Sequence, residues 1–153
     1  MHKILFICHG NICRSPMAEY IMKHLCSCNG RSDIEVSSVA VSTEEIGNDI
    51  YPPAKRVLTA HDIPFSKRAA RQITKADYDY YDYLVCMDES NLRWLRYIIG
   101  DDTAGKVSLL MSWAGQKRNV ADPWYTGDFQ TAYDDIYQGC CAMLSQLSVH
   151  KDK

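Results

Sequence analysis

Cys8 and Arg14 are separated by five residues near the start of the chain, in the segment Cys8-His9-Gly10-Asn11-Ile12-Cys13-Arg14-Ser15. Backbone N–H groups of a tight loop can converge on an anion, and an arginine fork can bind two phosphate oxygens at once. The same positive field favours the thiolate form of a cysteine, which is its nucleophilic form. Ser15 can hydrogen-bond the sulfur. The segment therefore predicts a phosphate-binding loop with Cys8 as nucleophile, which a buried apolar cysteine beside a surface arginine would not explain.

A candidate proton donor stands far along the chain, in Val120-Ala121-Asp122-Pro123-Trp124-Tyr125. Attack on a phosphate monoester expels an alkoxide or phenoxide, which leaves more easily when a carboxylic acid protonates it. Pro123 restricts Asp122 to extended backbone, and Trp124 and Tyr125 could line a cleft for a flat ring. From these residues alone, an ordinary Asp-Pro turn explains the segment equally well.

The elements that must position these residues follow from hydrophobic patterning. Residues 3–8 form an apolar run typical of a strand that is covered on both faces. Pro16 is expected as the first residue of a helix to Cys28, with Met17, Ile21, Leu25 and Cys28 on its buried face. The other predicted strands are 34–41, 83–87 and 107–111. One further helix is predicted after Pro52, one after Asp88 and one over 128–147. A capping box is predicted at 74–77, and a loop is predicted over 112–127.

Alternation of strands and helices predicts an α/β fold with a parallel sheet. Ligands of such sheets bind outside the carboxyl ends of the strands. Cys8 ends the first predicted strand. The predicted topology and the predicted chemistry therefore lead to the same loop.

Composition limits the other possibilities. The 153 residues, 46% hydrophobic and 24% charged, predict a single domain over 1–153. A net charge of -2 without a polybasic run disfavours nucleic acid or an anionic membrane as partner. No membrane span and no signal peptide is expected. The seven cysteines lack the spacing of a disulfide framework, so a cytoplasmic location with reduced thiols is predicted.

With these motifs the chain resembles the low-molecular-weight protein tyrosine phosphatases over nearly its whole length. The resemblance is carried by CHGNICRSPMAE at 8–19, MDESNL at 87–92 and DPWY at 122–125, in matching order and spacing. It implies a three-layer α/β fold, a four-stranded parallel sheet with helices on both faces and the phosphate-binding loop after strand 1. It also implies hydrolysis of phosphotyrosine monoesters through a phosphocysteine on Cys8, with Arg14 binding phosphate and Asp122 as general acid and base.

The resemblance extends to the other loop residues and to the partners. Ser15 would assist the sulfur, Asn11 would brace the loop, and phosphate would be bound by His9, Gly10, Asn11, Ile12, Cys13, Arg14 and Ser15. Tyrosine-phosphorylated proteins or peptides would be substrates and inorganic phosphate the product, with no metal or organic cofactor. Cys13 would trap an oxidised Cys8 as a reversible disulfide, although a small buried side chain is the alternative. Ile12 favours phosphotyrosine, because relatives that act on phosphoarginine tend to carry threonine there.

One departure from the family pattern affects the substrate cleft. Relatives usually have a Ser-Gly pair after the second strand, followed by an aromatic residue that forms one cleft wall. Here the chain reads SVAVSTEE over 38–45, and Glu44 is expected at the aromatic position. Together with Glu45 it would make this wall acidic, whereas Trp124 and Tyr125 would form the other. Substrates with basic flanks are therefore expected to be preferred.

Two other functions fit parts of the pattern. Arsenate reduction on the same fold uses the loop cysteine and two further cysteines in one mobile segment, whereas Cys86 stands alone in its region. A module that only binds phosphate or phosphopeptides would need the loop and Arg14 but neither Cys8 nor Asp122. Both alternatives are disfavoured by the same residues that favour a phosphatase.

Overall fold

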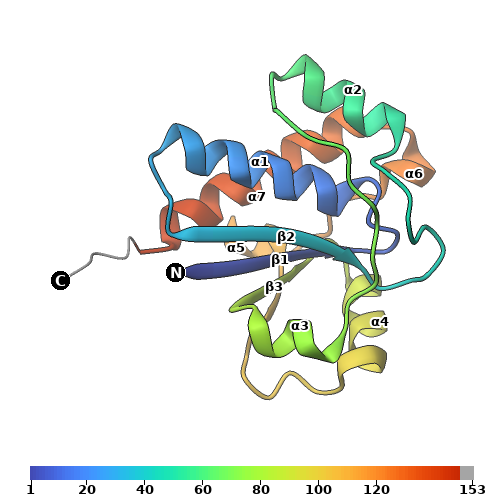
Figure 1. The fold of residues 1–153 in the computed structure, drawn as a ribbon, viewed down its shortest axis with the longest axis vertical. Coiled ribbons are helices and arrows are strands. Elements are labelled where there is room, and N and C mark those ends of the chain that lie inside the picture. The colour runs from blue at the N-terminus through green and yellow to red at the C-terminus, as the bar shows by residue number, and fades with distance from the viewer. Residues whose placement is uncertain (149–153) are drawn as a thin grey trace.

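A computed structural model of the chain describes residues 1–148. Its centre is a parallel sheet of four strands in the order β2-β1-β3-β4 (Figure 1). The strands are β1 (His2–Cys8), β2 (Ile34–Ala40), β3 (Tyr83–Cys86) and β4 (Val107–Leu109). The predicted four-stranded parallel sheet is confirmed.

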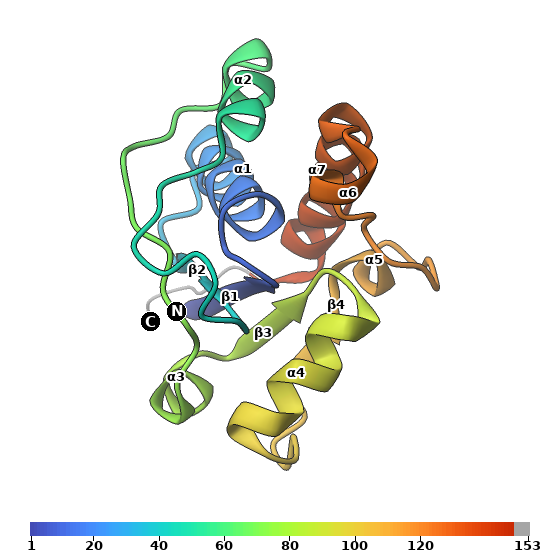
Figure 2. The ribbon, with the colours of Figure 1, turned by 90° about the vertical axis from the view of Figure 1, so that its right-hand side faces the viewer.

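Helices cover both faces of the sheet, so the molecule has three layers (Figure 2). On one side lie α1 (Arg14–Cys28), α2 (Pro52–Ala60), α5 (Leu110–Trp113), α6 (Pro123–Thr126) and α7 (Phe129–Gln146). On the other side lie α3 (Lys75–Tyr80) and α4 (Glu89–Ile99). Within residues 1–148, no helix combines the length and the apolarity needed to cross a membrane.

The buried central strand β1 joins two hydrophobic cores. Ile4 and Phe6 pack into the core shared with α1 and α7, whereas Leu5 and Ile7 pack into the core shared with α3 and α4. All four side chains are fully buried. Because burial of one such side chain contributes about 1.5–3 kcal/mol, this strand is held firmly from both faces. The residue that follows it, Cys8, therefore starts from a fixed position.

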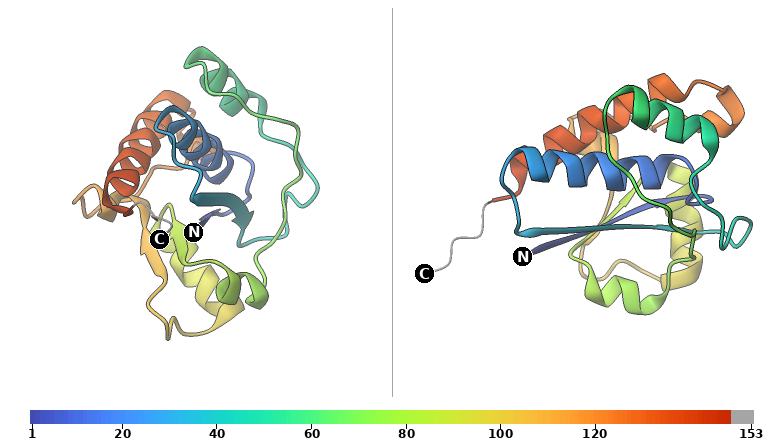
Figure 3. Two further views of the ribbon diagram at one scale, coloured as in Figure 1. Left: turned by 60° about the vertical axis from the view of Figure 1, so that its left-hand side comes forward. Right: turned by 45° about the horizontal axis from the view of Figure 1, so that its top comes forward.

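The order of the strands places the loop after β1 at a change of direction in the sheet. β2 and β3, the next two strands in sequence, pair with opposite edges of β1. The connections therefore diverge on either side of the carboxyl end of β1, which is where open α/β sheets bind ligands. Figure 3 shows from two further directions that the segments following β1 and β2 lie at this same edge.

The sequence-based boundaries need correction at α1. The helix begins at Arg14 rather than at Pro16, which is its third residue. Pro16 costs nothing there, since the first four helical N–H groups lack an intrahelical partner in any case. Cys28, expected on the buried face, is exposed, whereas Met17, Ile21 and Leu25 are buried as predicted.

The second correction concerns the region after β3. Leu110 and Met111 were expected to continue a strand but belong to α5, and 112–127 contains α6 in addition to loop. Both side chains are fully buried, and Leu110 packs where Gly139 lets α7 approach: a Cβ at Gly139 would lie 2.5 Å from the Leu110 Cγ. A short apolar run fits a strand or a buried helical turn equally well, and this packing decides the matter.

Candidate active site

The thiol of Cys8 lies at the floor of a pocket and is 3% exposed. Its Sγ atom accepts hydrogen bonds from the backbone N–H groups of Asn11 (3.3 Å) and Ser15 (3.4 Å). The Ser15 hydroxyl lies 3.0 Å from the same sulfur. Three donors therefore surround an atom that would carry negative charge as a thiolate, as an anion nest does.

Backbone pairing outside the loop turns those N–H groups inward. The outer carbonyls of the loop accept hydrogen bonds from the segment that follows β2: Val41 N–H to Cys8 (3.1 Å), Ser42 N–H to His9 (3.1 Å) and Tyr51 N–H to Ile12 (2.9 Å). With these carbonyls satisfied on the outside, the loop presents its N–H groups to the pocket. The segment 41–51 thus shapes the anion site without touching the sulfur.

Asn11 braces the loop from beneath and is fully buried. Its φ of 58° lies in the left-handed region, which Asn tolerates better than most residues. The side-chain amide donates to Ser15 Oγ (2.8 Å) and Ser38 Oγ (2.9 Å), and its oxygen accepts from the guanidinium of Arg68. Because Ser15 Oγ accepts from Asn11, its O–H group is left for the two acceptors in reach, Cys8 Sγ at 3.0 Å and the Val39 carbonyl at 3.4 Å, of which the sulfur is the nearer. The expected roles of Asn11 and Ser15 thus have a geometric basis.

A glycine at position 10 is not needed for a positive φ, since Asn11 alone in this loop has one. Space is the reason for glycine here. A Cβ at Gly10 would lie 3.3 Å from the Glu45 Cγ. Gly10 therefore allows the segment with Glu45 to approach the loop closely.

Arg14 is a charged side chain that is almost wholly buried, with 2% exposure. Its Nη1 donates to Asp88 Oδ2 (2.6 Å) and to the Val120 carbonyl (2.8 Å), and its Nη2 donates to Asp122 Oδ2 (3.3 Å). Burial alone would lower the pKa of Arg14, but the negative charges of Cys8, Asp122 and Asp88 raise it above its ordinary value. Arg14 therefore stays cationic beside the sulfur.

Asp122 reaches the pocket from a segment more than a hundred residues away in sequence. It caps α6, with its Oδ1 accepting from the Trp124 N–H (3.1 Å), while its Oδ2 accepts from Arg14. Its ψ of 110° is the extended conformation expected before Pro123. The carboxyl group is thus held above the loop and remains 24% exposed.

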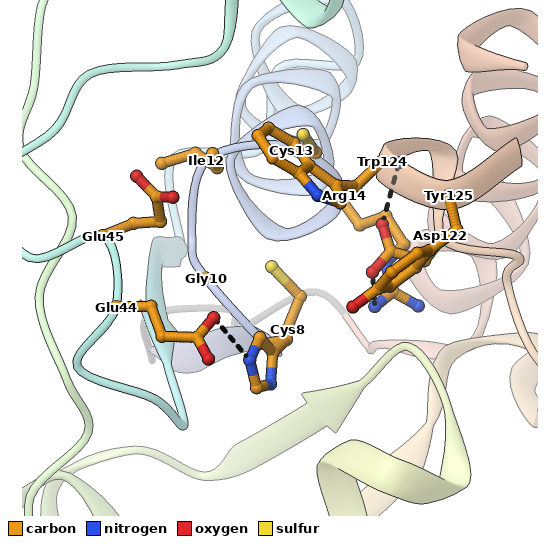
Figure 4. Close-up of a pocket in the computed structure, with 11 residues that line it drawn as sticks. Cys8, Gly10, Ile12, Cys13, Arg14, Glu44, Glu45, Asp122, Trp124 and Tyr125 are labelled. Carbon is orange, nitrogen blue, oxygen red and sulfur yellow. Dashed lines mark hydrogen bonds and ion pairs between the residues drawn. The ribbon is translucent and has the colours of Figure 1, made fainter. Parts of the chain in front are cut away.

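The walls of the pocket differ in chemistry (Figure 4). Glu44 and Glu45 lie on one side, and Trp124 and Tyr125 lie on the other, as the sequence predicted. The ring of Trp124, half-exposed, packs on Tyr51 with centroids 4.8 Å apart. A flat substrate ring would therefore enter between an aromatic wall and an acidic one.

The remaining loop residues also have defined places. His9, Gly10, Ile12 and Cys13 line the pocket, whereas Asn11 and Ser15 act from below and expose no side chain to it. His9 Nε2 lies 3.0 Å from Glu44 Oε2. Burial and the nearby charge of Cys8 raise the pKa of Cys13 well above its ordinary value, so Cys13 is a neutral thiol at physiological pH.

Several supporting residues were not found from the sequence. Ser38 links Asn11 to the buried carboxylate of Glu19, to which its hydroxyl donates at 2.6 Å. The side chain of Arg68 donates to Asn11 and to the Asn48 carbonyl. No local pattern marks these contacts, because each joins segments distant in sequence. Asp88, which precedes a helix predicted from the sequence, caps α4 and also accepts from Arg14 of the loop.

Among residues 1–148, no group of three or more His, Cys, Asp or Glu side chains is arranged to hold a metal ion. The groups that the pocket brings together are a sulfur among N–H donors, a guanidinium and a carboxyl. Fold and site together define a phosphate-binding loop with a cysteine at the change of direction of an open α/β sheet.

Comparison with known proteins gives the family. A family model described as low molecular weight phosphotyrosine protein phosphatase matches residues 3–153. The human low molecular weight phosphotyrosine protein phosphatase is 40% identical over 149 residues, 94% of this chain and 94% of that protein. Low molecular weight protein-tyrosine-phosphatase YfkJ of Bacillus subtilis is 34% identical over 156 residues, 100% of this chain and 99% of that protein.

Solved structures agree with the sequence comparisons. The crystal structure of YfkJ superposes with a TM-score of 0.90, covering 95% of this chain and 93% of that one. A Drosophila arginine phosphatase, 32% identical, superposes with a TM-score of 0.85 over 93% of this chain and 95% of that one. The chain belongs to the low molecular weight phosphotyrosine protein phosphatase family. The predicted family and enzyme class are thereby confirmed.

The brace beneath the loop can be tested with two residues that share one backbone conformation. Asn11 and Asp62 both have φ of 58°, but Asp62 is exposed and has no comparable network. Asp62→Ala should cost about 1 kcal/mol of unfolding free energy, through left-handed strain alone. Asn11→Ala should cost about 3 kcal/mol, because it also removes the two buried hydrogen bonds to Ser15 and Ser38, of about 1 kcal/mol each. Urea unfolding measures both, and equal losses would contradict the bracing role.

Proposed function

We propose that this enzyme hydrolyses phosphotyrosine in proteins or peptides and releases inorganic phosphate, with Cys8 as nucleophile, Arg14 as phosphate ligand and Asp122 as general acid and base. The observation that carries the proposal is the meeting of these three groups on one pocket, although they come from β1, α1 and the start of α6. A module that only binds phosphate would need neither the thiol nor the carboxyl group. Both are in reach of one bound phosphate monoester.

In the first step, the Cys8 thiolate attacks phosphorus. The loop N–H groups and Arg14 hold the phosphate oxygens as negative charge shifts among them. An S–P bond forms while the P–O bond to the tyrosine breaks, and the acid form of Asp122 gives its proton to the departing phenolate oxygen. The products are phosphocysteine and the dephosphorylated tyrosine of the protein or peptide.

In the second step, the Asp122 carboxylate takes a proton from water, and the water oxygen attacks phosphorus. The S–P bond breaks and inorganic phosphate leaves. The electrons of that bond return to Cys8, whose sulfur is 3.0 Å from the Ser15 hydroxyl. The hydrogen bond stabilises the thiolate as leaving group, just as it stabilises it as nucleophile.

The shape and the lining of the pocket support an aryl phosphate as substrate. Trp124, packed on Tyr51, and Tyr125 offer an aromatic wall, and Ile12 is an apolar residue of the pocket lining. The Drosophila arginine phosphatase has a similar fold, so phosphoarginine is the comparison substrate of choice. We place the enzyme in the cytoplasm, because its cysteines are free and reducing compartments keep thiols unpaired.

The catalytic roles predict a dependence on the leaving group. Cys8→Ser should abolish phosphate release from a phosphotyrosine peptide. Asp122→Asn should lower kcat by about 10²–10⁴, because no acid then protonates the leaving oxygen. With 4-nitrophenyl phosphate the loss should be smaller, since nitrophenolate leaves readily without a proton.

The exposed carboxylate of Asp134 on α7 provides the control, and Asp134→Asn should retain wild-type kcat. Phosphate release is also measured with phosphoserine and phosphoarginine peptides, for comparison with the phosphotyrosine peptide. Phosphate binding without turnover by the wild-type enzyme would favour a pure binding module. Faster turnover of phosphoarginine would reassign the substrate.

The acidic wall predicts a charge preference among peptides. Glu44 is 68% exposed in its side chain and pairs with His9 at the pocket rim. Peptides with lysine beside phosphotyrosine should have a kcat/KM about 3-fold above that of peptides with glutamate there, as expected for exposed charge pairs. Glu44→Gln should reduce this ratio, as should added salt. The idea fails if a charge-varied peptide panel shows one kcat/KM throughout.

We also infer that Cys13 protects the nucleophile during oxidation. Hydrogen peroxide converts the Cys8 thiolate to a sulfenic acid with release of hydroxide. The Cys13 thiol, in the wall of the same pocket, then displaces that hydroxyl as water and forms a disulfide. Peroxide-treated wild-type enzyme should regain most activity with dithiothreitol. Cys13→Ser should regain little, because its sulfenic acid is oxidised further, whereas the exposed-thiol variant Cys28→Ser should behave like wild type. Equal recovery by Cys13→Ser would exclude the role.

A further inference from the structure

An apolar groove lies beside the active site, between α4 and the segment that follows β2. Two of its residues are large and exposed: Trp94 is 46% and Tyr97 is 91% accessible. Neighbouring exposed apolar groups of this size are typical of interaction sites. The groove is lined by Val41, Gln72, Arg93, Trp94, Tyr97 and Ile98.

The groove adjoins the catalytic pocket through a contact between two aromatic rings. His9 lines the catalytic pocket, and its ring meets the ring of Trp94 edge-on, with centroids 5.7 Å apart. On its other side, His9 is fixed by Glu44 at 3.0 Å. A chain leaving the catalytic pocket across His9 therefore reaches the face of α4 that carries Trp94.

The two sites are also held in fixed register. Asp88 caps α4 by accepting from the Asn91 N–H at 2.8 Å, and its second oxygen accepts from Arg14 at 2.6 Å. The phosphate ligand is thus bonded directly to the start of the helix that bears the groove. When the phosphate of a substrate is bound at Arg14, Trp94 and Tyr97 therefore lie at a fixed distance from that phosphate.

We propose that this groove binds an apolar side chain, leucine or phenylalanine, that flanks phosphotyrosine in the peptide substrate. The assignment rests on the proposed function and follows from the continuity of the two sites. Phosphotyrosine buried in the pocket forces its own chain to continue over the rim, and an extended chain advances about 3.3 Å per residue. A residue within three positions of phosphotyrosine therefore spans His9 and reaches Trp94. A peptide substrate has residues beside its phosphotyrosine that can cover this apolar surface, whereas a free aryl phosphate has none.

The test uses one phosphotyrosine peptide in which each of the three positions on either side is leucine or alanine in turn. With the wild-type enzyme, leucine at one or more positions should raise kcat/KM by about 3–10-fold over alanine, the gain expected from partial burial of one side chain. Tyr97→Ala and Trp94→Ala should bring this leucine-to-alanine ratio close to 1. Tyr137→Ala, which removes an exposed aromatic residue on α7, should leave the ratio as in wild type.

The ratio separates the possible failures. Equal turnover of leucine and alanine peptides by the wild type, or a preference that survives in both groove variants, would overturn the groove assignment while the phosphatase function stands. Absence of turnover for every phosphotyrosine peptide would overturn the proposed function and the groove with it. Concentration-dependent dimerisation that Tyr97→Ala abolishes, without any flank preference, would assign the groove to a second copy of this chain and overturn the proposal.

Discussion

A buried sulfur that must carry negative charge is the constraint on which the rest of this structure depends. An uncompensated anion in a protein interior is strongly disfavoured, so the chain must surround Cys8 with donors before any chemistry is possible. It does so by bonding the loop carbonyls outward to residues 41, 42 and 51, which leaves the N–H groups inside. Asn11, in a left-handed conformation, makes the turn and directs the Ser15 hydroxyl to the sulfur. In the proposed mechanism, the same inward-facing N–H groups stabilise the thiolate and bind phosphate.

Arg14 extends this arrangement across the molecule. Its guanidinium bonds Asp88 at the start of α4, the Val120 carbonyl and Asp122 at the start of α6. Through these contacts Arg14 holds the carboxyl group of Asp122 beside the loop, and in the proposed mechanism it would also hold the phosphate oxygens. Since orientation of reacting groups accounts for much of enzymatic rate enhancement, this network is prepared before substrate arrives. Phosphate would share the cation that now pairs with both carboxylates, which leaves Asp122 free to exchange its proton with the leaving group.

Sequence reasoning succeeded where the signal is local. The spacing of Cys8 and Arg14 and the strand before them act within a few residues and predict the loop, whereas Asp122 was singled out from an ordinary Asp-Pro turn only by the family resemblance. Sequence reasoning failed where contacts between distant segments decide the outcome. Leu110 and Met111 fit a strand until their packing near Gly139 is seen. Gly10 is explained by Glu45 rather than by its own dihedral angles. Ser38, Tyr51 and Trp94 gave no signal as parts of the site, because their partners lie in other elements.

The residues that local sequence patterns predict form the floor of the pocket, whereas many of the residues that only the fold brings together lie around its rim. Its floor is built from β1 and the start of α1, which are buried and rigid, and the floor needs only to bind phosphate and position sulfur. Its rim carries exposed groups from separate segments, Glu44 after β2 and Tyr125 on α6, and Trp94 on α4 adjoins it through His9. Under the proposed function, a change at the floor is expected to remove catalysis, whereas a change at the rim is expected to alter which flanking residues are tolerated. We therefore expect the preference for flanking residues to be set around His9, which contacts both Glu44 and Trp94.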